Sequence, residues 1–88
     1  MAAYRVRFKP SADKALSKLP VAIQRRIVAA AEALADDPRP AGAVKLTGED
    51  ELYRIRVGDY RIVYQIQDRV LMVLVVRIGH RRDVYRGL

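Results

Sequence analysis

Arginines recur through the last third of this chain at spacings that suit phosphate binding. Arg54 and Arg56 alternate with apolar residues, and Arg61 follows a Gly-Asp pair. The residues that could carry chemistry here are Arg54, Arg56, Arg61, His80, Arg81, Arg82 and Tyr85. A guanidinium group presents forked donors that match phosphate oxygens. So many cations on one small sheet repel each other unless an anion is bound, and a nucleic-acid backbone is the obvious large anion.

Strands that would position these side chains follow from the alternation of apolar and polar residues. Leu52–Val57 and Tyr60–Gln67 each alternate, and Gly58-Asp59 between them indicates a tight turn. Residues 70–78 are apolar on both faces, as expected of a central strand. Because successive side chains of a strand point to opposite faces, burial of Ile55 and Ile62 sends Arg54, Arg56 and Arg61 to the other, open face.

The first half of the chain predicts a strand and a helical hairpin. Tyr4, Val6 and Phe8 alternate with Arg5, Arg7 and Lys9, which we interpret as edge-strand charges that deter aggregation. A short helix is expected from an N-cap at Ser11 to residue 18, and Pro20 separates it from a second helix that stops before Pro38. The apolar stripe of the second helix is Ile23, Ile27, Ala30 and Leu34.

Residues 38–50 contain Pro and Gly and are expected to be a loop, and residues 83–85 a short edge strand. The fold class is therefore α+β. An N-terminal strand and a helical hairpin precede an antiparallel meander of three to four strands, with the hairpin on one sheet face.

Length and composition restrict the class of protein. The 88 residues predict a single domain, residues 1–88, and the formal net charge of +7 favours nucleic acid, a membrane surface or an acidic protein as partner. The longest apolar run, residues 70–76, is far shorter than the roughly 20 residues that span a bilayer, so we expect a soluble, cytoplasmic protein without a membrane partner. The sequence has no cysteine, metal-ligand cluster, nucleotide-binding loop or Ser/His/Asp set, so no metal and no cofactor is expected.

The motifs of the last third resemble those of a known family. The string YRIRVGDYRIVYQI, then an apolar strand, RIGHR and DVY, resembles the RelE/ParE superfamily of bacterial and archaeal toxins, and the likeness covers nearly the whole chain. It implies the RelE/ParE-like microbial RNase fold. The tail resembles the RelE branch, whose members cut messenger RNA in the ribosomal A site, more than the ParE branch, whose members poison DNA gyrase.

The resemblance also implies roles for single residues. Arg61, Arg81, Tyr85 and His80 correspond to the catalytic group, and Arg54, Arg56, Arg82 and Lys45 to the RNA-binding or phosphate-binding group. Arg54 and Arg56 replace a lysine pair of the family, and arginine stays protonated where lysine can be tuned towards acid–base chemistry. Metal-free RNA cleavage needs a base, an acid and cations that stabilise the phosphorane. Tyr85 and His80 are both candidates for the base.

Partners and alternatives follow from the same resemblance. The implied partners are a cognate small antitoxin (RelB-like) with an acidic tail, mRNA on the ribosome, and operator DNA through the antitoxin complex. Two other functions are compatible with the sequence: a non-enzymatic inhibitor of gyrase, and an attenuated toxin that acts only in antitoxin and operator binding.

Overall fold

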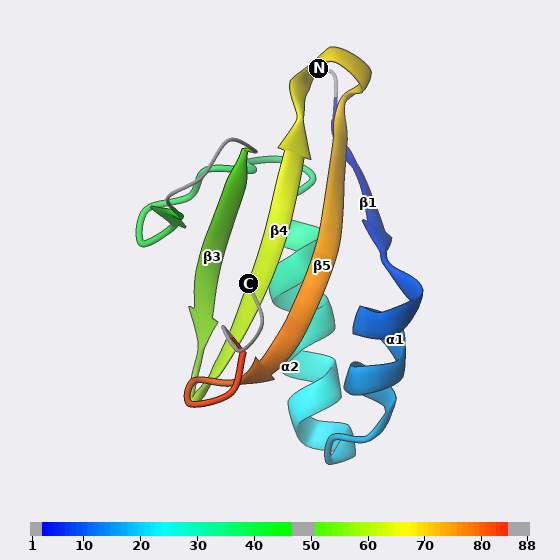
Figure 1. The fold of residues 1–88 in the computed structure, drawn as a ribbon. Coiled ribbons are helices and arrows are strands. Elements are labelled where there is room, and N and C mark those ends of the chain that lie inside the picture. Colours follow the sequence, from blue (N-terminus) through cyan, green and yellow to red (C-terminus); the bar gives the residue numbers. More distant parts are fainter. Residues whose placement is uncertain (1–2, 47–50, 85–88) are drawn as a thin grey trace.

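The protein folds into a five-stranded sheet with two helices on one of its faces (Figure 1). The computed structural model describes residues 3–46 and 51–84. Its elements are β1 (Arg5–Phe8), α1 (Pro10–Ser17), α2 (Val21–Ala33), β2 (Val44–Lys45), β3 (Leu52–Val57), β4 (Tyr60–Gln67), a 3₁₀ turn (Asp68–Val70) and β5 (Met72–His80). The predicted α+β class, with a helical hairpin between the first strand and the meander, is confirmed. Neither helix has the length and apolar character needed to cross a membrane.

The sheet is mixed, and β5 is an interior strand between β1 and β4. The strand order is β1-β5-β4-β3-β2, in which β3, β4 and β5 form the predicted antiparallel meander. The N-terminal strand β1 joins the free edge of β5 in parallel, with Arg5 opposite Met72 and Phe8 opposite Val75. This interior position, with a strand on each side, explains why β5 is apolar on both of its faces.

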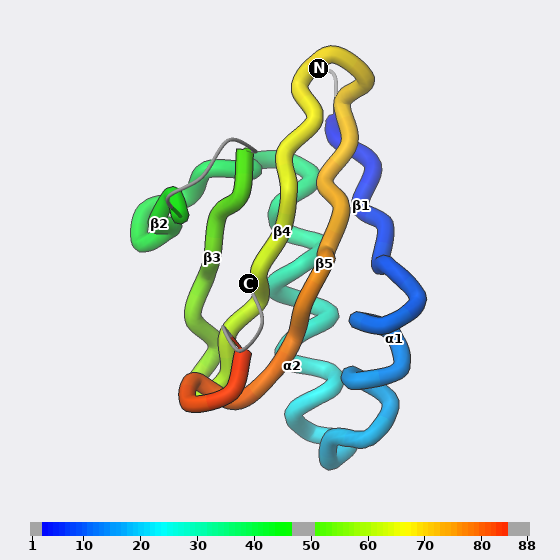
Figure 2. The backbone as a smooth tube through the Cα atoms, viewed as in Figure 1, coloured from blue at the N-terminus to red at the C-terminus, as the bar shows by residue number. Residues whose placement is uncertain are grey.

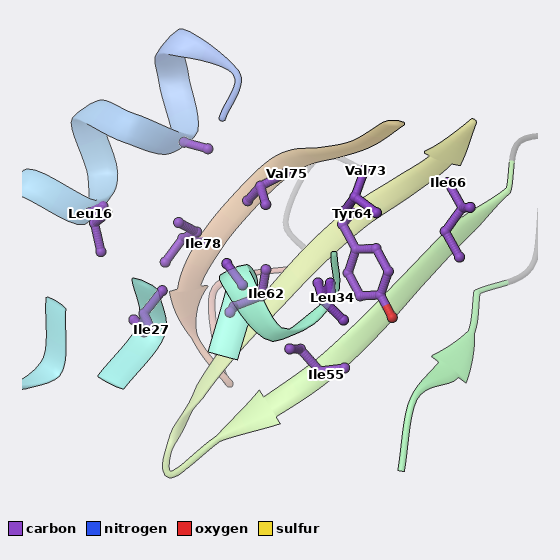
Figure 3. Packing of buried hydrophobic residues seen from close by; sticks show 12 residues of the cluster. Leu16, Ile27, Leu34, Ile55, Ile62, Tyr64, Ile66, Val73, Val75 and Ile78 are labelled. Atoms are coloured by element: carbon purple, nitrogen blue, oxygen red, sulfur yellow. The ribbon is translucent and has the colours of Figure 1, made fainter. Parts of the chain in front are cut away.

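The hydrophobic core lies between the helices and the sheet (Figure 3). Ile27 and Leu34 of α2 meet Ile55, Ile62 and Tyr64 of the sheet, and Leu16 of α1 faces Ile78 and Val75 of β5. Tyr64 is fully buried, and its hydroxyl donates a hydrogen bond of 2.7 Å to the carbonyl oxygen of Pro38. That bond ties the loop after α2 to the middle of the sheet.

Four local expectations differ from the structure. Helix α1 begins at Pro10 with Lys9 as its N-cap, so Ser11 lies inside the first turn, where the fixed φ of proline already suits a helix. Strand β2 forms within the segment expected to be a loop, because Val44 and Lys45 pair with β3.

At the other end, Asp83 and Val84 lie in a turn and not in an edge strand, and Tyr85 falls outside the described residues. Strand β5 starts at Met72, after the 3₁₀ turn and Leu71, whose φ of 52° interrupts the extended backbone.

Candidate nucleic-acid interface

The sheet face opposite the helices, called the open face here, collects the arginines of the last third. Ladder pairing places Arg56, Arg61 and Gly79 in one row across β3, β4 and β5, and Arg54, Val63 and Arg77 in the next row. Because the core residues Ile55, Ile62 and Ile78 alternate with these positions, the arginines point away from the helices. The predicted placing of Arg54, Arg56 and Arg61 on one open face is confirmed.

Arg56 and Arg61 are directly opposite each other at the end of the β3–β4 hairpin. Like charges in such a pair destabilise a sheet, so the arrangement favours a bound anion. The Arg61 guanidinium donates from Nη1 to the carbonyl oxygens of Gly58 (3.3 Å) and Tyr60 (3.1 Å), which holds it over the turn. Gly58 has φ of +59°, as the first central residue of a type II′ hairpin turn requires. The tight turn thus brings the two guanidinium groups to the same corner.

The chain after β5 folds back over the open face. Arg81 donates its backbone N–H to the carbonyl oxygen of Asp59 (2.8 Å), so this segment lies beside the β3–β4 turn (Figure 2). Arg77 donates from Nη1 to the carbonyl oxygen of Val84 (3.2 Å). A Cβ added at Gly79 would lie 3.6 Å from Val84, which is buried outside the helix-side core. Arg81 and Arg82, both exposed, therefore join the corner that Arg61 occupies.

His80 points to the other side of the sheet. It is opposite Tyr60, which packs against the helix-side core, and the two rings meet edge to face with centroids 5.8 Å apart. Its Nδ1 accepts a hydrogen bond of 3.3 Å from the backbone N–H of Arg82. The structure therefore does not bring the His80 ring onto the open face with Arg61.

Lys45 also lies away from the open-face arginines. It is opposite Tyr53, whose ring stacks on buried Tyr64, and its Nζ forms an ion pair with Glu51 at 3.3 Å. Its ammonium group belongs to a second polar group at the opposite end of the sheet.

That second group is centred on Arg39, which the sequence analysis missed. Arg39 pairs with Asp68 at 2.9 Å, donates to the Tyr53 hydroxyl at 3.1 Å and lies 5.3 Å from the centre of the Tyr53 ring. The hydrogen bonds from Arg39 and Tyr4 lower the pKa of Asp68 below its ordinary value, and the bond to Asp68 raises the pKa of Tyr4. These contacts join segments that are far apart in sequence, so no local pattern announces them. The Arg39 cluster fixes the loop after α2 and leaves the open-face arginines unaffected.

No group of His, Cys, Asp and Glu side chains within residues 3–46 and 51–84 could hold a metal ion. A cavity of about 630 Å³ lies between α2 and β3, lined mainly by small and apolar residues such as Ala30, Ala33, Gly42 and Val44. Asp37, Arg54 and Arg56 also line it, so the cavity adjoins the β3 arginines. The chemistry-bearing residues are therefore those of the open face.

Comparison with known proteins agrees with this geometry. Residues 6–85 match the sequence model of the family described as "ParE toxin of type II toxin-antitoxin system, parDE". A putative RelE-like toxin protein of Escherichia coli is 37% identical, with 93% of this chain and 90% of the relative aligned. Toxin RelG of Mycobacterium tuberculosis is 34% identical, with 94% and 97% aligned.

Solved structures give the same result. The complex RelBE2 of Mycobacterium tuberculosis contains a chain that superposes with a TM-score of 0.81 at 34% identity, covering 94% of this chain and 97% of the other. The archaeal RelE-RelB complex of Pyrococcus horikoshii gives a TM-score of 0.78 at 30% identity, covering 93% and 99%.

A helical hairpin on one sheet face and a row of arginines on the other define the class: a small toxin of a type II toxin–antitoxin system. The chain belongs to the RelE/ParE superfamily, and within it the chain is a RelE-like toxin.

Proposed function

We propose that this toxin is a ribosome-dependent endoribonuclease that cuts mRNA in the A site and so inhibits translation. The observation that carries the proposal is the gathering of Arg54, Arg56 and Arg61 on the sheet face opposite the helices, with Arg81 at the same corner. Such a row of cations suits a single-stranded phosphate backbone.

The reaction divides into proton transfers and charge stabilisation. A base removes the proton of the ribose 2′-OH, the 2′ oxygen attacks the neighbouring phosphorus, and the bond from phosphorus to the 5′ oxygen breaks. An acid returns a proton to that leaving oxygen, so that the products are a 2′,3′-cyclic phosphate and a free 5′-OH. Arginine is always protonated, so we assign Arg61, Arg81 and the Arg54/Arg56 pair to stabilising the phosphorane and binding its flanking phosphates.

For the base, we propose Tyr85 in preference to His80. The proposal is supported by the position of His80, whose ring packs on Tyr60 on the helix side and whose Nδ1 already accepts a hydrogen bond. A guanidinium group close to a tyrosine favours its ionised form, and Arg81 and Arg82 precede Tyr85 by only four and three residues in the sequence. We expect Tyr85→Phe to abolish most cleavage and His80→Ala to retain it. The opposite ranking in a single-turnover cleavage assay would exclude Tyr85.

Primer extension on a translated mRNA tests the function itself. Wild-type expression should give cuts at codons in the A site, and Arg61→Ala should reduce the rate about 10²- to 10³-fold, as loss of a donor to the transition state does. Arg25→Ala is the matched control, because Arg25 is an exposed arginine on α2. Absence of A-site cuts with the wild type would refute the proposal.

A second candidate is inhibition of DNA gyrase, because the matching family model describes a ParE toxin. The relatives named above as RelE-like, together with RelE-RelB complexes among the solved structures, favour RNA. Purified gyrase in a supercoiling assay separates the two: inhibition or trapped cleavage complexes with no mRNA cuts would support the gyrase reading.

We further propose a cognate RelB-like antitoxin as the partner in the cytoplasm, with operator DNA bound through the complex. The solved relatives of Pyrococcus and Mycobacterium are toxin–antitoxin complexes. An acidic antitoxin segment would neutralise the open-face arginines, in agreement with the net charge of +7. Pull-down with the neighbouring gene product, at low and high salt, tests this. No complex at low salt would contradict it.

A further inference from the structure

The open face carries a second basic patch that the proposed cleavage chemistry does not use. Arg5 and Arg7 lie on β1, and the parallel register with Met72 and Leu74 puts both side chains on the open face. Val6 and Phe8, which alternate with them, pack against the core on the helix side. Arg5 and Arg7 are both exposed. We call these two residues the β1 patch.

The β1 patch and the Arg61 corner belong to one continuous surface. The row of Arg7 runs through Leu74 and Gln65 to Leu52, and it is the next open-face row beyond that of Arg54. The strand positions of this face, within the described part of the chain, contain no Asp or Glu. Of the ion pairs found between described residues, all use Arg39 or Lys45, and neither Arg5 nor Arg7 takes part. Both guanidinium groups are thus available to an external anion.

The distance between the β1 patch and the Arg61 corner sets the minimum length of an anion that binds both. Arg61 and Arg7 are separated by two strand spacings and by four residues along β4. At about 4.8 Å per strand and about 3.3 Å per residue, the separation is about 16 Å. A single phosphate cannot bridge such a gap. A strand stacked as in a helix, which rises about 3.4 Å along its axis per nucleotide, covers it with about five nucleotides.

We propose that the β1 patch is a second phosphate-binding subsite, which holds the substrate RNA about five nucleotides from the bond to be cut. The proposal rests on the proposed ribonuclease function and adds the path of the RNA: from the Arg61 corner, diagonally across Gln65 and Leu74, to the β1 edge. Edge-strand arginines that only deter aggregation would have no preference for RNA of a given length, so length is the quantity to measure.

The test uses single-stranded RNA with 2′-O-methyl ribose throughout, which binds and is not cut. Oligonucleotides of about four and about ten nucleotides are compared, because of the two only the longer one, stacked at about 3.4 Å per nucleotide, spans about 16 Å from the Arg61 corner. The full chain and the double variant Arg5→Gln/Arg7→Gln are titrated by fluorescence anisotropy at several salt concentrations. Lys18→Gln/Arg25→Gln is the matched control, since it removes two exposed charges from the helices.

The β1 variant should lose several-fold affinity for the longer RNA and keep that for the shorter one. Its salt dependence should fall by about 1.4 in the slope of log K against log salt, for two contacts to a single strand. The control should bind both RNAs as the wild type does, apart from a small, length-independent loss. Arg5→Lys/Arg7→Lys should restore most of the affinity.

Several results would overturn the subsite. These are an unchanged affinity for the longer RNA, an equal loss for both lengths, or a loss no larger than that of the control. Weakened antitoxin binding with unchanged RNA binding would assign the patch to an acidic protein. Slower cleavage only on ribosomes, with unchanged oligonucleotide binding, would assign it to ribosomal RNA. A length-dependent loss without A-site cuts would keep the subsite and refute the proposed nuclease, so the two proposals fail separately.

Discussion

The hydroxyl of Tyr64 gives a prediction whose size follows from the structure. Tyr64 is fully buried and donates a 2.7 Å hydrogen bond to the carbonyl oxygen of Pro38. Tyr64→Phe keeps the ring and removes the donor, which leaves a buried carbonyl without its partner. Such a loss costs about 1–3 kcal/mol of the free energy of unfolding, and we expect about 2. For a domain of this size that lowers Tm by roughly 8–16 °C.

Tyr53→Phe is the matched control. The two rings stack with centroids 6.0 Å apart, and the Tyr53 hydroxyl is bonded to Arg39 and Glu51 in an exposed cluster that water can replace. We expect a loss within about 0.5 kcal/mol. Urea unfolding followed by circular dichroism at neutral pH measures both. Equal losses for the two variants would refute the reasoning from burial.

High pH gives a second readout of the same bond. Burial raises the pKa of Tyr64 to about 12, whereas an unfolded tyrosine titrates near 10. The contribution of the protonated hydroxyl to the free energy of unfolding is therefore fully present below about pH 10, and it is lost as the pH rises through about 12. The advantage of the wild type over Tyr64→Phe should shrink across that window. A difference that stays constant with pH would contradict a raised pKa in the folded state.

Two further changes have defined outcomes. Asp68→Asn should destabilise the protein at neutral pH more than the exposed control Asp36→Asn. The difference from wild type should vanish as the pH falls below the ordinary Asp value of 3.8 and through the lowered pKa, as urea titrations at neutral and acid pH would show. Gly58→Ala should cost about 1–2 kcal/mol, because φ is +59° at a position where an added Cβ meets only the Arg26 side chain at 3.5 Å. Gly42→Ala is the comparison, because Gly42 has φ of +94° and an added Cβ there would meet nothing within 4 Å. In the same thermal unfolding assay it measures the cost of backbone strain without any side-chain contact.

The alternation of apolar and polar residues predicted the meander well, because successive side chains of a strand point to opposite faces and the apolar ones point to the core. Leu52–Val57 and Tyr60–Gln67 are strands with the predicted bounds, and the open-face position of Arg54 and Arg61 follows from burial of their neighbours. The pairing of β1 was not predicted. Alternation indicates that residues 4–9 form a strand, but it does not determine which strand of the sheet they pair with.

The residues of the site divide in the same way. Positions within strands were assigned correctly to a face, whereas His80 and Lys45 required the ladder register, which sends both towards the helix side. The Arg39 cluster depends on contacts across 14 and 29 residues of sequence, and such contacts appear only once the chain is folded. The β1 patch also emerged only from the parallel register.

The position of β5 has a consequence for synthesis of the chain. β5, which lies between β1 and β4, is made last among the sheet strands, so β1 cannot pair until the residues from Met72 onwards have been synthesised. At about 5–20 residues per second, translation separates Arg5 and Met72 by roughly 3–13 s. During that interval β1 has no neighbouring strand in the sheet. A premature stop codon before residue 72 would therefore leave β1 separated from the β3–β4 hairpin, because β5 is the strand that joins them.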